Sequence, residues 1–104
     1  MLKQGGQIVG FEANGHAGFD EEGSDIVCSA VSALTQTIAL GLQERLQLPV
    51  GLSINEGSMH CILGRDCTKT QCEQAALLFD TLLLGLKSME AAYGEYLSIM
   101  EREV

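Results

Sequence analysis

A histidine and a cysteine near the N-terminus have side chains that could act together as base and nucleophile. His16 follows an apolar segment in the sequence Gly15-His16-Ala17, and Cys28 lies within the run from Gly23 to Ser32. A thiolate is a strong nucleophile, and an imidazole beside it can accept a proton and later return it. This combination is typical of cysteine hydrolases.

The residues before Cys28 predict the start of a helix. Ser24 and Asp25 are polar residues that favour helix caps, and an apolar-periodic run follows them, so Cys28 is expected in the first turn. The unpaired N–H groups of a helix N-terminus would lower the pKa of the Cys28 thiol and could hold the oxyanion of a tetrahedral intermediate. Cysteine is also a common core filler, and a histidine after a strand is commonly a hydrogen-bonded loop residue. From the residues alone, both interpretations stay open.

Two further polar residues lie close to Cys28 in the sequence. Asp25 precedes Cys28 by one helical turn, so both would share a helix face. Asp25 could orient His16 or contact a substrate, or it could simply complement the helix dipole. Ser32, one turn after Cys28, could line the site, or its small size could allow close helix packing.

The remaining cysteines do not form a metal-binding pattern. His60, Cys61, Cys67 and Cys72 contain no C-x₂-C pair, and neighbouring residues on a strand point to opposite faces. We therefore expect no metal and no other cofactor. Cys61 is expected to pack on a sheet face, and Cys67 and Cys72 are expected to be ordinary thiols.

Periodicity indicates the elements that must position these side chains. A strand is expected at 7–13, a helix from Ser24 to about Leu48, a hairpin of strands at 50–54 and 58–63, and a second helix that begins with the capping box Thr70-Gln71-Cys72-Glu73. The apolar stripe of this second helix comprises Leu78, Leu82, Leu86, Met89, Tyr93, Tyr96 and Met100. The order predicts a single α+β domain over residues 1–104, with a small, mostly antiparallel sheet packed against two helices.

Charge and composition narrow the classes of partner. Fourteen acidic residues against six Lys and Arg give a net charge of −8. Such a surface repels phosphate backbones and anionic lipid, so we expect neither nucleic-acid nor membrane binding, and a basic partner instead. No signal peptide and no long uninterrupted apolar run is visible, so we expect a cytoplasmic protein with reduced thiols.

The segments Gly15-His16-Ala17 and Gly23-Ser24-Asp25-Ile26-Val27-Cys28-Ser29-Ala30-Val31-Ser32 together resemble the Prp family of ribosomal-processing cysteine proteases. The element order is similar over nearly the whole chain. The resemblance implies a cytoplasmic endopeptidase, usually a homodimer, that removes the N-terminal extension of a large-subunit ribosomal protein precursor. It also implies a Cys–His dyad with Cys28 as nucleophile and His16 as catalytic histidine. The loop from Ala17 to Gly23 matches the mobile segment of that family.

Two structural expectations and two functional alternatives remain. The family opens with a further strand, of which only Met1-Leu2-Lys3 is left here, so we expect either an incomplete sheet edge or a true start that lies upstream. The apolar stripe of the second helix is expected to supply a dimer surface.

A non-catalytic ribosome-associated factor that binds the same basic partner is one alternative. A thiol-based redox sensor, which would need a resolving cysteine near Cys28, is the other.

Overall fold

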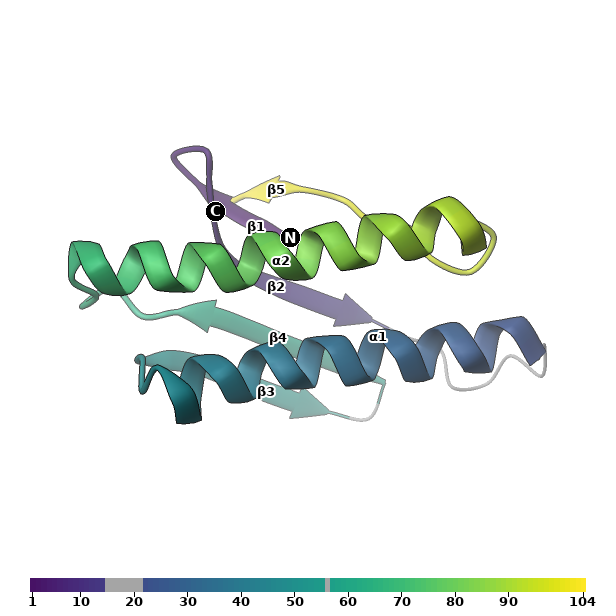
Figure 1. Cartoon of the computed structure of the whole chain (residues 1–104), viewed down its shortest axis with the longest axis horizontal. Helices are drawn as coiled ribbons and strands as arrows, with labels where there is room; N and C mark the ends of the chain where they lie inside the picture. The colour runs from purple at the N-terminus through teal and green to yellow at the C-terminus, as the bar shows by residue number, and fades with distance from the viewer. Residues whose placement is uncertain (15–21, 56) are drawn as a thin grey trace.

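The computed structural model describes residues 1–14, 22–55 and 57–104 of the chain (Figure 1). Its elements in chain order are β1 (Leu2–Gln4), β2 (Gln7–Asn14), α1 (Glu22–Leu40) with a π-helical last turn η1 (Gly41–Arg45), β3 (Val50–Asn55), β4 (Ser58–Leu63), α2 (Lys69–Tyr93) and β5 (Arg102–Glu103). The expected order of strand, helix, hairpin and long helix is confirmed.

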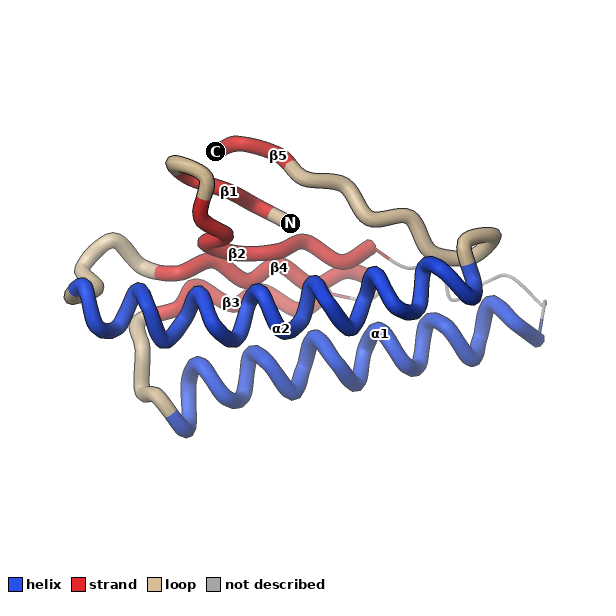
Figure 2. Tube along the Cα trace, turned by 45° about the horizontal axis from the view of Figure 1, so that its top comes forward, coloured by secondary structure: helices blue, strands red, loops and turns tan. Residues whose placement is uncertain are grey.

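The strands form one mixed sheet in the order β3-β4-β2-β1-β5. All neighbouring strands are antiparallel except β1 and β5, which are parallel. Helices α1 and α2 lie side by side over one face of this sheet (Figures 1 and 2). The α+β class with two helices on a small, mostly antiparallel sheet is therefore confirmed.

The core lies between the helices and one set of alternating strand residues. Phe11, Cys61 and Leu52 form one cross-strand row on this face, and Phe11 meets Phe79 of α2 edge to face at 6.3 Å between ring centroids. The next row, Glu12, His60 and Ser53, points to the other face, as the two-residue period of a strand requires.

Part of the apolar stripe of α2 faces this core, while Tyr93 is exposed, and the expectation that the helix supplies a dimer surface stays a prediction. Leu82 and Leu86 are buried against the sheet and α1. The exposed leucines of the helix are Leu77, 68% exposed, and Leu84, 70% exposed. When two helices pack side by side on one sheet, the side chains that stay most exposed are those that point away from the core.

Several ends of the elements differ from the expectation. The helix α1 begins at Glu22 instead of Ser24. The capping box of α2 is formed by Thr68 and Gln71 instead of Thr70 and Glu73, and α2 ends at Tyr93, where Gly94 follows, instead of continuing to Met100.

The sheet edge near the N-terminus is also more complete than expected. Three residues, Leu2–Gln4, are enough to form β1, because this strand pairs with β2 on one side and with β5 on the other. Gly5 and Gly6 adopt φ values of 59° and 81° in the turn that follows, a region that glycine enters without steric cost.

Candidate active site

The site expected from the sequence is built at the end of β2 and the beginning of α1. β2 ends at Asn14, and α1 begins at Glu22. Gly15 and His16 lie between them, outside the residues that the structure describes, as does most of the glycine-containing loop. In the sequence, His16 is therefore the second residue after β2. The position of its side chain stays a prediction.

Cys28 is a half-buried free thiol on α1. Because the helix begins at Glu22, Cys28 is its seventh residue and lies beyond the first turn. The expected activation by the helix N-terminus is weakened, since that effect falls off within one turn. A partner such as the His16 imidazole is then needed to activate this thiol.

Asp25 and Ser32 lie one turn before and one turn after Cys28, as the sequence spacing indicated. Asp25 is part of α1, and its side chain is outside the described part of the structure. Ser32 is exposed on α1. Both residues are thus within about one helical turn of Cys28 along α1, and their roles stay predictions.

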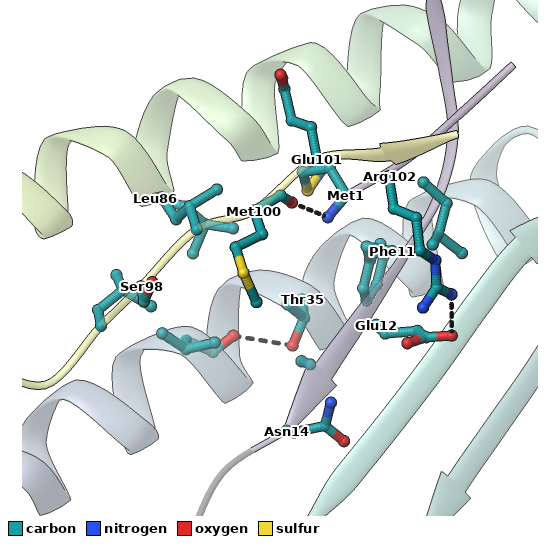
Figure 3. Close-up of a pocket in the computed structure, with 15 residues that line it drawn as sticks. Met1, Phe11, Glu12, Asn14, Thr35, Leu86, Ser98, Met100, Glu101 and Arg102 are labelled. Atoms are coloured by element: carbon teal, nitrogen blue, oxygen red, sulfur yellow. Dashed lines mark hydrogen bonds and ion pairs between the residues drawn. The ribbon is translucent and has the colours of Figure 1, made fainter. Parts of the chain in front are cut away.

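A groove of about 500 Å³ runs along the same face of α1 (Figure 3). Val31, which lies three residues after Cys28, and Thr35 line it from α1, and Leu86 lines it from α2. Positions three and four apart share a helix face, so Cys28 lies at the end of the row that forms this wall. The other lining residues are Met1, Leu2, Phe11–Asn14 of β2 and Leu97–Arg102 of the C-terminal segment.

One edge of β2 is open beside the groove. β1 pairs with β2 only at Gln7, Ile8 and Gly10, whereas β4 pairs with β2 as far as Asn14. Within the described part of the chain, the backbone of 11–14 therefore has no strand partner on the β1 side. Such an edge can accept an extended peptide through main-chain hydrogen bonds.

The C-terminal wall of the groove is tied down at several points. The N-terminal ammonium of Met1 donates to the Met100 carbonyl at 2.8 Å, and the Ile99 N–H donates to Glu90 Oε2 at 2.8 Å. Arg102 donates to Glu12 Oε1 at 3.0 Å (Figure 3). Burial lowers the pKa of the Met1 amino group, opposed by the nearby Glu101 and Glu12 carboxylates. These contacts hold Leu97–Met100 in place across from the open edge of β2.

The sequence contains no signal for this groove, because its two sides come from opposite ends of the chain. The second helix is expected to continue to Met100, and nothing local pairs this segment with β2. Only the contact of the two chain ends places them there.

The fold places His60 and Cys61, two of the residues considered as metal ligands, on opposite faces of the sheet. No group of three or more His, Cys, Asp or Glu side chains among the described residues could hold a metal ion. His60 Nε2 lies 3.6 Å from Glu12 Oε1 on the open face of the sheet. Cys61, on the opposite face, is completely buried, and burial raises the pKa of its thiol to about 11. The expected packing of Cys61 on a sheet face is confirmed.

The whole fold has close relatives among solved structures. A protein from Streptococcus mutans, SMU.848, is 30% identical, with a TM-score of 0.82 over 99% of this chain and 90% of that chain. Two structures of the essential ribosomal processing protease Prp from S. aureus also share the fold. The one in complex with a substrate peptide is 22% identical, with a TM-score of 0.78 over 99% of this chain and 93% of that chain. The one with a covalently linked product peptide is 21% identical, with a TM-score of 0.78 over 97% and 93%.

A comparison with curated proteins finds no match. The family model described as cysteine protease Prp matches residues 1–98, which is nearly the whole chain and includes both segments of the candidate site. The protein therefore belongs to the cysteine protease Prp family.

Proposed function

We propose that this protein is a cysteine endopeptidase that removes the N-terminal extension of a large-subunit ribosomal protein precursor. The observation that carries the proposal is the position of Cys28 on α1, three residues before Val31, which lines the groove. The similarity to the S. aureus protease, whose structures contain a substrate peptide and a product peptide, supports it.

The proposed reaction uses Cys28 and His16 as a dyad. Cys28 Sγ attacks the carbonyl carbon of the scissile peptide bond while the His16 imidazole takes the thiol proton. His16 then gives this proton to the leaving amine, which departs and leaves a thioester on Cys28. A water molecule, deprotonated by His16, attacks the thioester, and the thiol is regenerated. Gly15, Asp25 and Ser32 are proposed to support this dyad or contact the substrate.

The groove supplies what an extended peptide needs. The open edge at 11–14 offers main-chain hydrogen bonds, and Val31, Leu86 and Leu97 offer apolar contacts for side chains. The carboxylates of Glu12 and Glu101 also line it, paired with Arg102 and Lys3. The net charge of −8 of the whole chain favours a substrate rich in Lys and Arg, as ribosomal proteins are.

The proposal includes a cytoplasmic location, a homodimer, and no direct contact with nucleic acid or membrane. The segment Ile26–Arg45 is long and apolar enough to cross a membrane, with a mean hydropathy of 1.5. In this fold it packs against α2, and its residues Val27, Ala39 and Leu42 are buried, while Ile26 and Leu40 are exposed.

Incubation with a ribosomal protein precursor that carries its N-terminal extension tests the proposal. Time-resolved mass spectrometry should show the mature protein and the released extension for the wild type and for the control Cys72→Ala, and no product for Cys28→Ala. Binding of the precursor without shortening would support the non-catalytic alternative. Equal cleavage by Cys28→Ala would remove Cys28 from the mechanism.

A further inference from the structure

Two cysteines flank the first turn of α2, away from the candidate active site. Thr68 is the N-cap, and its Oγ1 accepts a hydrogen bond from the Gln71 N–H at 3.1 Å, while its own N–H donates to Gln71 Oε1 at 2.9 Å. Cys67 immediately precedes this cap. Cys72 is the fourth helical residue, and its N–H donates to the Thr68 carbonyl at 2.9 Å. The capping box therefore fixes the turn that separates the two cysteines.

These two positions are the ones whose side chains pack together in a hydrophobic staple. In most helices apolar residues fill them, whereas both are thiols here. Cys72 Sγ lies 3.9 Å from the Cys67 carbonyl oxygen, and Cys67 Sγ donates to the Gly64 carbonyl at 3.3 Å. Burial, the neighbouring Cys72 thiol and Asp66 together raise the pKa of the Cys67 thiol. The two thiols thus face each other across the start of the helix.

We propose that Cys67 and Cys72 form a reversible disulfide that closes the first turn of α2 when the protein is exposed to a peroxide. Hydrogen peroxide transfers one oxygen to a thiol, giving a sulfenic acid and one water. The second thiol attacks the sulfenic sulfur, the S–S bond forms, and a second water leaves. A dithiol reductant reverses the step by thiol–disulfide exchange.

Among the four cysteines, Cys67 and Cys72 are the pair that the fold makes available for a disulfide. Both are half-buried and within reach of a small oxidant, whereas Cys61 is completely buried. Cys28 is near the start of α1, and the start of α2 lies at the opposite end of the paired helices (Figure 1). The disulfide would lock the turn that leads to the core residues Ala75 and Phe79. This proposal does not depend on the proteolytic function.

Tryptic mapping offers a direct test, because Lys69 lies between the two cysteines. Cys28→Ser protein is treated with hydrogen peroxide, its remaining thiols are blocked, and it is digested without reductant. We expect peptides 66–69 and 70–87 to be recovered mainly as one linked species that disappears after dithiothreitol. The oxidised protein should also melt at least about 5 °C higher, because closing a short loop restricts the unfolded chain. Oxidised but unlinked peptides, or an unchanged melting temperature, would overturn the proposal.

A pair of variants separates the effect of the fold from mere closeness in sequence. Thr68→Ala removes the cap, whereas Thr70→Ala changes a similar, exposed residue of the same turn. We expect the disulfide to form at least about threefold more slowly in Thr68→Ala and in protein unfolded in guanidinium. Loss of the cap costs the first turn of the helix roughly 1 kcal/mol, which is about a fivefold change in the equilibrium for forming that turn. Thr70→Ala should link at the wild-type rate. Equal rates in all four samples would show that the staple does not position the thiols.

Discussion

At the scale of single residues, Cys61 is buried while the other three cysteines are half-buried, so Cys61 should be the least reactive. Cys28 is half-buried on α1, Cys61 is completely buried with its pKa raised to about 11, and burial also raises the pKa of the Cys67 thiol. We expect iodoacetamide at neutral pH to label Cys28 first and Cys61 at least about tenfold more slowly, because only the thiolate reacts. Timed quenching and peptide mapping measure this order. Earlier labelling of Cys67 or Cys72 would contradict the choice of nucleophile.

The two histidines provide a matched pair for the proposed dyad. In the sequence His16 lies between β2 and α1, whereas His60 faces Glu12 on the open side of the sheet. His16→Ala should lower the rate of precursor cleavage at least ~10²-fold, because the general base is lost. His60→Ala should cleave within about twofold of the wild type. Both variants should keep the wild-type circular dichroism spectrum, so that a rate loss reports chemistry. Retained cleavage by His16→Ala would falsify the dyad.

At the scale of elements, the close approach of β2 and β4 requires a glycine. A Cβ at Gly10 would clash with the Cys61 carbonyl oxygen, whereas a Cβ at Gly51 would lie 3.4 Å from the γ2 methyl group of Ile62. Both glycines pair with Ile62, from opposite sides of β4. Gly10→Ala should lower the free energy of unfolding by about 2–3 kcal/mol, and Gly51→Ala by less than about 1 kcal/mol. Urea denaturation measures both, and equal losses would argue against this strand spacing.

At the scale of the whole molecule, the helical layer leaves apolar side chains uncovered. Ile26 and Leu40 of α1 and Leu77 and Leu84 of α2 are exposed on it. We expect light scattering to give about twice the mass of one 11.1 kDa chain, because association would remove these side chains from water. Leu84→Lys should shift the protein towards the monomer.

The matched control for this surface is Ile54→Lys, which changes an exposed apolar residue of β3 instead of one on a helix. It should leave the mass unchanged. A wild-type protein with the mass of one chain at micromolar concentration would contradict the homodimer. A dimer lost only in Ile54→Lys would move the interface from the helices to the sheet.

The sequence by itself determined the features that depend on local preferences. Two-residue alternation defined β2 and the hairpin of β3 and β4, and the spacing of leucines such as Leu82 and Leu86 defined the buried face of α2. His16 and Cys28 could be proposed as a pair because both flank one short loop between adjacent elements. Local patterns were sufficient there, since each residue's neighbours in space are mostly its neighbours in sequence.

The tertiary structure alone decided the features that depend on distant contacts. The apolar residues near Met100 continue a helical period, yet they form an extended segment, because pairing of β5 with β1 and the bond from Met1 to Met100 stabilise that arrangement. These contacts join residues about a hundred positions apart and complete one side of the groove. No local pattern encodes such a pairing, because its free energy arises only when the two ends of the chain meet on the finished sheet.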